Sequence, residues 1–244
     1  MAKDIDDRNI EEDLITLERI LGFVFHDKSH LLTAITHRSY LNEHRDAKQE
    51  HNERMEFLGD AVLELIVTDF LFHKYKEKPE GELTAIRSAL VNTNSLADAS
   101  TKLGVNDYLL MSKGEAKDTG RARQYILANA FEAFIGALYL DQGYVVAQKF
   151  VEEQLFSKTE LIVEKKLWQD AKSRIQELAQ EHKGVTPTYT TLGQEGPDHD
   201  RVFTVGIFLG KEKIAEGKGR AKQEAEQEAA QKAIEVLEKK YIQS

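Results

Sequence analysis

Asn52–Leu63, N-E-R-M-E-F-L-G-D-A-V-L, is the stretch of this 244-residue chain that decides its fold. At about 100° per residue, its acidic side chains and the next acid along fall within an arc of about 80°. These acids are Glu53, Glu56, Asp60 and Glu64. The opposite side carries apolar residues, namely Met55, Leu58, Val62, Leu65 and Ile66. The pattern predicts an amphipathic helix with one face in a core and a stripe of carboxylates on the other.

The acidic stripe needs a positively charged partner. Like charges three and four residues apart destabilise a helix, and no basic side chain falls within the stripe. A hard divalent cation, which prefers oxygen ligands, meets that need, and a stripe that is merely solvated is the alternative. Gly59 lies in the same helix, where glycine costs about 1 kcal/mol relative to alanine. We therefore expect another backbone to pack closely against Gly59.

A second polar element lies in an apolar segment, where Asn129 and Glu132 share a helical face with Gly136. The residues around that face are Leu127, Phe131, Phe134, Ile135 and Leu138. An unpaired carboxylate in a buried helix is costly, so Glu132 must be hydrogen-bonded or bound to a cation. A hydrogen bond between helices remains the alternative, but the carboxylate stripe in the same domain favours metal binding.

The hydrophobic period divides the chain into two domains. Apolar residues recur at helical spacing up to about residue 156, which predicts an all-α domain over residues 11–156. A charged segment poor in apolar residues, 157–168, is expected to be a linker. Residues 169–240 then read as a helix, three strands and a helix, at 171–182, 186–192, 201–209, 211–217 and 221–239. The expected fold is therefore multidomain, with an all-α domain followed by an α+β domain of α-β-β-β-α order.

Several blocks of the sequence resemble bacterial ribonuclease III, the endonuclease of double-stranded RNA. The segment Asn52–Leu63 resembles the signature of that family. Further blocks occur in family order, namely Thr36–Tyr40 (T-H-R-S-Y), Glu80-Gly81 and Ile126–Gly143. The α-β-β-β-α layout is that of a double-stranded RNA-binding domain. The resemblance therefore covers nearly the whole chain and implies a ribonuclease III catalytic domain followed by an RNA-binding domain.

The resemblance also implies a set of site residues. Asp60 and Glu132 match catalytic acids, and Glu56, Asp60 and Glu132 match metal ligands, while Glu80 matches a further acid near the site. At Asn129 the family has an aspartate that binds metal. Asparagine keeps a carbonyl oxygen but lacks the charge, which weakens attraction for a cation without abolishing coordination. The implied cofactor is Mg²⁺, with Mn²⁺ as a possible substitute.

The implied function is that of a hydrolase. A homodimer cleaves double-stranded RNA, with one strand cut at each site, and leaves 5′-phosphate and 3′-hydroxyl ends; the substrates are ribosomal RNA precursors and structured messenger RNA. One alternative is a double-stranded RNA-binding protein that Asn129 has weakened as a catalyst. Another is a metal-dependent phosphohydrolase of a different substrate class, which the C-terminal domain disfavours.

The resemblance places RNA contacts in the second domain at Gln176, His199 and Lys222. The net charge of −9 does not suit a nucleic-acid binder, but residues 168–244 carry 12 Lys and Arg against 13 Asp and Glu. Most of the acidic excess therefore lies in the first domain, and RNA binding must use local basic patches. The chain has no cysteine, no long apolar run and no signal-peptide pattern. We expect a cytoplasmic protein that does not bind membranes.

Overall fold

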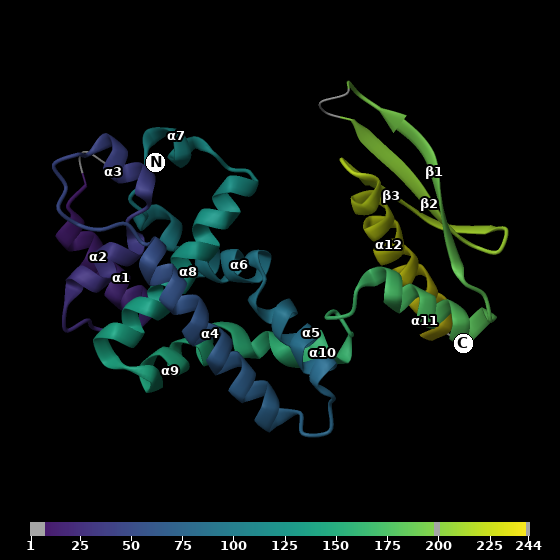
Figure 1. Cartoon of the computed structure of the whole chain (residues 1–244), viewed down its shortest axis with the longest axis horizontal. Helices are drawn as coiled ribbons and strands as arrows, with labels where there is room; N and C mark the ends of the chain where they lie inside the picture. Colours follow the sequence, from purple (N-terminus) through teal and green to yellow (C-terminus); the bar gives the residue numbers. More distant parts are fainter. Residues whose placement is uncertain (1–7, 198–200, 243–244) are drawn as a thin grey trace. The chain divides into compact units, whose positions relative to one another are not determined.

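The computed structural model describes residues 8–197 and 201–242, and the chain divides into two compact units, Met1–Trp168 and Gln169–Ser244 (Figure 1). The first unit is helical throughout. Its elements are α1 (Ile10–Leu21), α2 (Lys28–Ile35), α3 (Arg38–Glu43), α4 (Glu53–Lys74), α5 (Glu80–Val91), α6 (Thr93–Leu103), the 3₁₀ helix η2 (Val105–Tyr108), α7 (Lys113–Lys117), α8 (Arg121–Gln142), α9 (Tyr144–Leu155), the 3₁₀ helix η3 (Phe156–Lys158) and α10 (Thr159–Glu164).

Helix α8 forms the centre of the first unit because it is apolar on nearly every side. Phe131, Phe134 and Ile135 have no exposed surface, and α2, α4, α6 and α9 pack around this helix (Figure 1). A helix that is hydrophobic all round must be buried, which explains its position. The expected all-α domain is confirmed, and α8 fixes how the surrounding helices are arranged.

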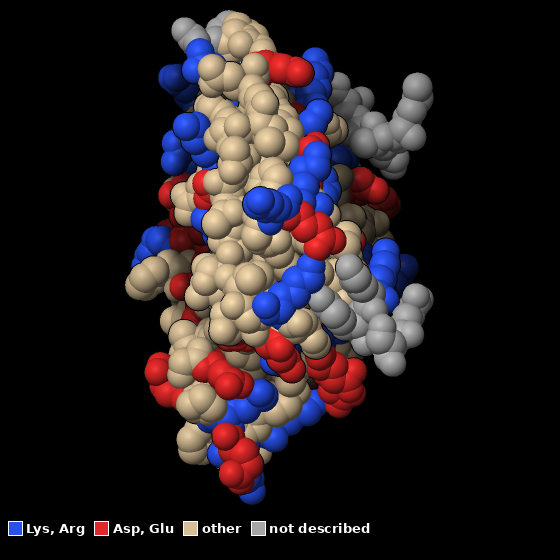
Figure 2. Space-filling model, turned by 90° about the vertical axis from the view of Figure 1, so that its right-hand side faces the viewer, with Lys and Arg blue, Asp and Glu red and all other residues tan. Residues whose placement is uncertain are grey.

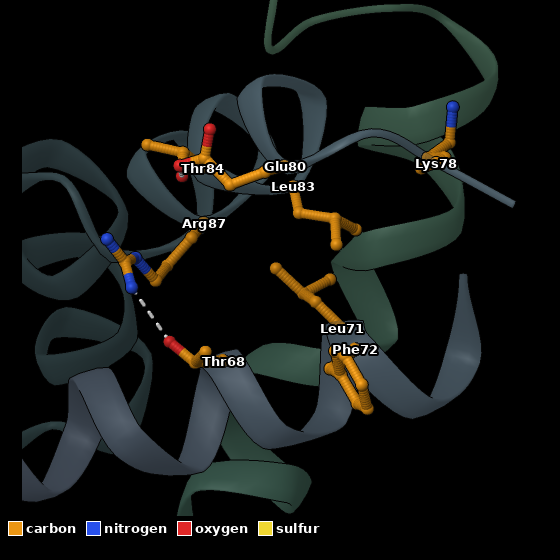
Figure 3. A pocket seen from close by; sticks show the side chains of 8 residues that line it. All are labelled: Thr68, Leu71, Phe72, Lys78, Glu80, Leu83, Thr84 and Arg87. Atoms are coloured by element: carbon orange, nitrogen blue, oxygen red, sulfur yellow. Dashed lines mark hydrogen bonds between the residues drawn. The ribbon is translucent and has the colours of Figure 1, made fainter. Parts of the chain in front are cut away.

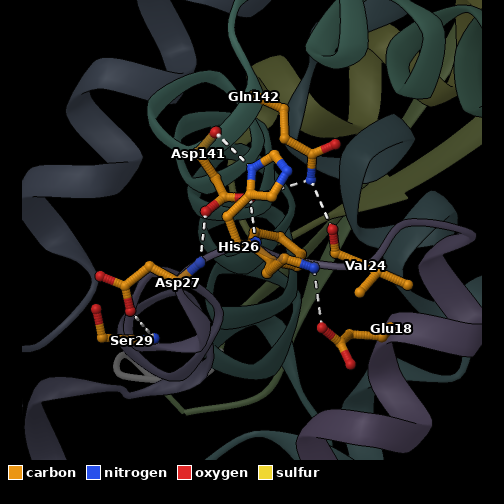
Figure 4. A network of polar contacts seen from close by, with 8 residues as sticks. Glu18, Val24, His26, Asp27, Ser29, Asp141 and Gln142 are labelled. Atoms are coloured by element: carbon orange, nitrogen blue, oxygen red, sulfur yellow. Dashed lines mark hydrogen bonds and ion pairs between the residues drawn. The ribbon is translucent and has the colours of Figure 1, made fainter.

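Two carboxylates hold the loop between α1 and α2 in place, Asp141 at the end of α8 and Glu18 on α1 (Figure 4). The Asp141 carboxylate accepts the backbone N–H groups of His26 at 2.9 Å and Asp27 at 2.8 Å. From the other side, Glu18 accepts the backbone N–H of Phe25 at 2.9 Å. These bonds satisfy backbone donors that the loop leaves without partners, so Glu18 and Asp141 have structural roles.

The segment expected as a linker, 157–168, differs from that expectation. It contains α10, and Ile162 on this helix is 9% exposed and belongs to the core of the first unit. Trp168 packs partly buried against the same core, with the Nζ atom of Lys78 at 5.8 Å from the centre of its ring. The apolar residues of this helix are consecutive, at 161–163, so no helical period marked it in the sequence. The first unit therefore extends beyond residue 156, as far as Trp168.

The second unit has the expected α-β-β-β-α order, which is confirmed. Its elements are α11 (Ala171–Lys183), β1 (Pro187–Glu195), β2 (Val202–Leu209), β3 (Glu212–Gly219) and α12 (Lys222–Ile242). The strands form an antiparallel sheet in the order β1-β2-β3. Helix α12 lies so close to β3 that a Cβ atom on Gly217 would be 2.2 Å from the carbonyl oxygen of Ala225. Glycine permits this contact because it has no side chain.

The core of the second unit lies between its helices and one face of the sheet. Ile207 and Leu209 on β2 point inward and are buried with Ile175 of α11 and Ala229 of α12. The alternation along β2 places neighbouring residues on the opposite face. In the described part of the chain, no helix is long and apolar enough to cross a membrane.

Candidate active site and RNA-binding surface

The two polar segments predicted from the sequence meet where α4 crosses α8. A Cβ atom on Gly59 would lie 1.8 Å from the backbone oxygen of Glu132, and one on Gly136 would lie 2.3 Å from the backbone oxygen of Met55. Only residues without side chains permit such an approach. The predicted close packing at Gly59 is confirmed, and it brings the acidic stripe of α4 beside Glu132.

Three carboxylates influence one another at this crossing. Burial raises the pKa of Glu132 to about 8, and the charges of Asp60, Glu56 and Glu64 contribute to the rise. Burial also raises the pKa of Glu56, together with the charges of Glu53 and Asp60. Both shifts have the sign expected for carboxylates that share a poorly hydrated site. Ionisation at the centre of the site is therefore costly, and no basic side chain among the described residues forms an ion pair with Glu56, Asp60 or Glu132.

Asn129 lies in the same group, one turn before Glu132 on α8. Its side chain is hydrogen-bonded to the Glu56 carboxylate and lowers the pKa of Glu56, against the larger effect of burial. The amide must donate in this bond, because an ionised carboxylate only accepts. An aspartate at this position has no such donor. Asn129 therefore makes a contact with Glu56 that could not be foreseen from the charge of the side chain alone.

The ends of the acidic stripe are neutralised by arginines from other helices. Arg38 of α3 lies 3.3 Å from Glu53, and Arg87 of α5 lies 2.8 Å from Glu64. The sequence showed only that no basic side chain falls within the stripe itself, and these two arginines come from segments distant in the sequence. The need for a cation is therefore concentrated at Glu56, Asp60 and Glu132.

Among residues 8–197 and 201–242, no three His, Cys, Asp or Glu side chains are gathered closely enough to hold a metal ion as they stand. Mutual repulsion among Glu56, Asp60 and Glu132 opposes such gathering when no cation is present. The chemistry of the donors nevertheless fits a hard divalent ion, since each offers carboxylate oxygens and Asn129 adds an amide oxygen.

Glu80 lies apart from this carboxylate group. It is exposed in the first turn of α5 and accepts a hydrogen bond from the Thr84 hydroxyl at 3.1 Å. Figure 3 shows it at a pocket of about 440 Å³ between α4 and α5, where Arg87 also donates to the Thr68 hydroxyl at 2.8 Å. Glu80 is not among the charges that raise the pKa of Glu132. The arginine that pairs with Glu64 thus connects this pocket to the acidic stripe.

One face of α4 is more exposed than its sequence suggested. Leu65, which we expected in the core, is 58% exposed, and Phe57 and Phe72 are 79% and 65% exposed. The assignment of Leu65 was wrong because the contact at Gly59 sets the core face, and Leu65 lies about 120° around the helix from Gly59. The helical spacing of Phe57, Leu65 and Phe72 was the available signal for this apolar stripe, which sequence reasoning missed.

In the second unit, two of the three predicted RNA contacts can be placed. Gln176 is exposed on α11, at a recess of about 570 Å³ that it shares with Glu177 and Gln180. Lys222 is the exposed first residue of α12, and its Nζ atom lies 6.0 Å from the centre of the Phe203 ring. His199 lies outside the described residues. In the face shown in Figure 2, basic and acidic side chains are interspersed around uncharged ones, so the local basic patches stay a prediction.

Comparison with protein families gives two matches, one within each of the two units. The model described as Ribonuclease-III-like matches residues 27–159, and the model described as Double-stranded RNA binding motif matches residues 171–237. Ribonuclease 3 of Carboxydothermus hydrogenoformans is 46% identical over 227 residues, which are 93% of this chain and 97% of the relative. Ribonuclease 3 of Enterococcus faecalis is 44% identical over 91% of this chain and 96% of its own length.

A solved structure resembles the first unit. The nuclease domain of ribonuclease III from Campylobacter jejuni is 41% identical, covers 60% of this chain and 98% of its own, and has a TM-score of 0.51. That domain is described as having structural flexibility in a region involved in dimer formation. A second crystal structure of that nuclease domain matches with the same identity and TM-score. The helical arrangement around α4 and α8 is therefore shared with a known nuclease domain.

Proposed function

Because this chain belongs to the ribonuclease III family of double-stranded RNA endoribonucleases, we propose that Glu56, Asp60 and Glu132 form its catalytic metal site. Its relatives carry the name of the enzyme, and nothing in them supports the alternative of a binding protein that Asn129 has weakened as a catalyst. The RNA-binding motif likewise disfavours a phosphohydrolase of another substrate class. Catalysis in this family depends on a metal, and the proposal concerns which residues hold it and which ion it is.

The metal supplies the main chemistry of phosphodiester hydrolysis. When bound, it polarises a phosphoryl oxygen, acidifies the attacking water and stabilises the leaving 3′ oxygen. We assign Glu56 and Glu132 as direct ligands. Asp60, which is exposed at the edge of the group, is a ligand or orients the attacking water. Glu132, with a pKa of about 8, retains its proton at neutral pH until a cation replaces it. Asn129 offers its amide oxygen as a weaker ligand.

We propose Mg²⁺ as the physiological ion, with Mn²⁺ as a substitute. Carboxylate and amide oxygens suit hard cations, and Mg²⁺ is usually held by a few carboxylates together with phosphate oxygens of the substrate. The site offers a few carboxylates, Glu56, Asp60 and Glu132, whose charges act on one another. In this proposal the RNA completes the coordination, and Glu80, which lies apart on α5, is not one of the ligands.

We propose that the enzyme acts as a homodimer through the exposed stripe of α4. Phe57, Leu65 and Phe72 are large apolar side chains that lie more than half exposed along one helix face. Large apolar side chains exposed along one helix face are a mark of an interface. A second copy of the same helix is its proposed partner, which agrees with the dimer formation named for the Campylobacter jejuni nuclease domain. A Phe57→Glu variant should elute as a monomer in light-scattering chromatography, whereas an unchanged dimer would remove this assignment.

The dimer explains how a duplex is cut. Each of its two sites cleaves one strand, and the products carry 5′-phosphate and 3′-hydroxyl ends with a short 3′ overhang. Gln176, His199 and Lys222 of the second unit contact the duplex by shape, 2′-hydroxyl groups and phosphates, because A-form RNA hides its base edges. We propose ribosomal RNA precursors and structured messenger RNA in the cytoplasm as the substrates.

The observation that carries the active-site proposal is the approach of Glu132 to the α4 carboxylates at the Gly59–Gly136 crossing. Glu132→Gln should bind duplex RNA as the parent does yet fail to cut it in Mg²⁺, because it loses a ligand charge at the metal. Glu153→Gln on α9, which changes an exposed acid outside the site, is the matched control and should cut normally. Cleavage by Glu132→Gln at the parental rate would show that Glu132 is structural.

A further inference from the structure

A polar cavity lies between the beginnings of α6 and α8. It has a volume of about 510 Å³ and is lined by Asn92, Thr93, Asn94, Arg121, Gln124 and Tyr125. Every lining side chain is polar or partly polar, which distinguishes this cavity from the largely apolar pockets that take drug-like ligands. Its chemistry therefore suits a hydrophilic partner.

The hydrogen-bonding groups in this cavity are mostly unused. Asn92 is engaged, since its side chain accepts the backbone N–H of Ser95 at 2.9 Å and caps α6. The side chains of Asn94, Gln124 and Tyr125 make no hydrogen bond to any residue that the structure describes. Tyr125 is also 52% exposed although it is aromatic. Several amide and hydroxyl groups thus face one cavity with their donors and acceptors available.

The cavity and the proposed active site lie along the same face of α8. Arg121, Tyr125, Asn129 and Glu132 are spaced four, four and three residues apart on α8, so they fall within about 80° of one helix face. Tyr125 precedes Glu132 by about 10 Å along the helix axis. A polymer whose reacting phosphate is at Glu132 can therefore extend over the cavity with its adjoining nucleotides.

The available groups match the chemistry of a nucleic-acid backbone. Asn, Gln, Thr, Tyr and Arg side chains are the groups that contact phosphate and sugar oxygens, and such contacts set the position of a duplex on a protein. An amide or hydroxyl that both donates and accepts can also bond to the 2′-hydroxyl, which distinguishes RNA from DNA. Positive charge at the cavity comes from Arg121.

We propose that this cavity binds the ribose–phosphate backbone of the strand being cut, next to the scissile bond, and that Gln124 or Tyr125 bonds to a 2′-hydroxyl there. The inference rests on the proposed function, because it takes the reacting phosphate to lie at Glu132. It adds a contact of the catalytic unit that reads the sugar and fixes the register of cleavage, separate from the contacts of the second unit.

The test combines protein variants with substrates that lack single hydroxyls. Tyr125→Phe and Gln124→Ala are compared with Tyr139→Phe, which removes the same hydroxyl elsewhere on α8 and outside the cavity. A short duplex with one defined cleavage position is prepared with a single 2′-deoxy substitution at each nucleotide around that position. Cleavage in Mg²⁺ gives kcat/KM for every pair, and thermal melting shows that each variant is folded.

One variant, Tyr125→Phe or Gln124→Ala, should lose about fivefold in kcat/KM on the all-ribose duplex, the effect of one hydrogen bond. At one nucleotide, the 2′-deoxy substitution should lower kcat/KM of the parent by a similar factor. The same substitution should not lower kcat/KM of this variant any further, because the hydrogen bond is already absent. Tyr139→Phe should behave as the parent. The inference would be overturned if both cavity variants cut at the parental rate. It would also be overturned if, at every nucleotide, the 2′-deoxy substitution lowered kcat/KM of the variants by the same factor as that of the parent. If the proposed function itself fails, the parent and Tyr139→Phe will not cut the duplex either.

Discussion

The raised pKa of Glu132 predicts that the metal-free enzyme loses stability as the pH rises. In the unfolded chain this carboxyl ionises near its ordinary pKa of 4.5, whereas in the folded protein it ionises near 8. Between these values the folded state holds one proton more than the unfolded state. The free energy of unfolding therefore falls as pH increases, and the loss is complete once the pH exceeds about 8.

The size of this effect follows from the shift. A rise from 4.5 to about 8 corresponds to roughly 5 kcal/mol at about 1.4 kcal/mol per pKa unit. Glu132 is only partly buried, so solvent screens part of the interaction and we expect about half of that value, roughly 2 to 3 kcal/mol. Glu132→Gln cannot ionise and should lose none of this contribution between pH 5 and pH 8.

Urea unfolding of metal-free protein at pH 5, 6.5 and 8 measures this prediction directly. The free energy of unfolding of the parent should fall across the series by roughly 2 to 3 kcal/mol more than that of Glu132→Gln. Titrating groups distant from Glu132 cancel in this difference. Added Mg²⁺ should restore the parent at pH 8, because the cation replaces the proton. Parallel curves for the two proteins without metal would refute the account of a buried, repelled carboxylate at this position.

Three further predictions concern the same crossing and the division of the chain. Asn129→Asp should cut faster than the parent at limiting Mg²⁺ and at the same rate at saturating Mg²⁺. Without metal it should be less stable than the parent, because it replaces the donor to Glu56 with a carboxylate. A Mg²⁺ titration that shows no gain in cleavage rate would mean that Asn129 is not a weakened ligand. Gly59→Ala should cost at least about 1 to 3 kcal/mol in urea unfolding and reduce cleavage, whereas Gly81→Ala, where a Cβ atom meets nothing within 4 Å, should be harmless; equal stability of the two would refute the close packing. Removal of 169–244 should leave a folded dimer that cuts slowly at low salt and binds long duplexes poorly at physiological salt, and affinity equal to that of the whole chain would contradict this division of labour.

The sequence predicted those features that depend on spacing along the chain. The acids of α4, the glycine between them and the buried face of α8 follow from a period of 3.6 residues, and the order of elements in the second unit follows from the change of that period. Gly59 was informative because a glycine inside a helix is unfavourable unless a neighbour requires it. The structure placed the backbone of Glu132 at that position.

Other features were not available from spacing. Residues 157–168 look like a charged linker in composition, but Ile162, Val163 and Trp168 pack against the core of the first unit. Leu65 has the same hydrophobicity as its buried neighbours, and only the direction from which α8 approaches makes it exposed. Burial depends on which neighbour a helix face meets, and a helical period does not name that neighbour.

By itself, the sequence determined that this protein carries a helix with a carboxylate stripe, a second buried acid and an α-β-β-β-α unit, because helix and strand periods are local properties of the chain. Only the tertiary structure decided which of those carboxylates lack a counter-ion. Arg38 pairs with Glu53 and Arg87 pairs with Glu64, and neither arginine is a helical neighbour of its partner. Electrostatic interaction depends on distance in space, so the charge at Glu56, Asp60 and Glu132 emerges only when separate helices pack together.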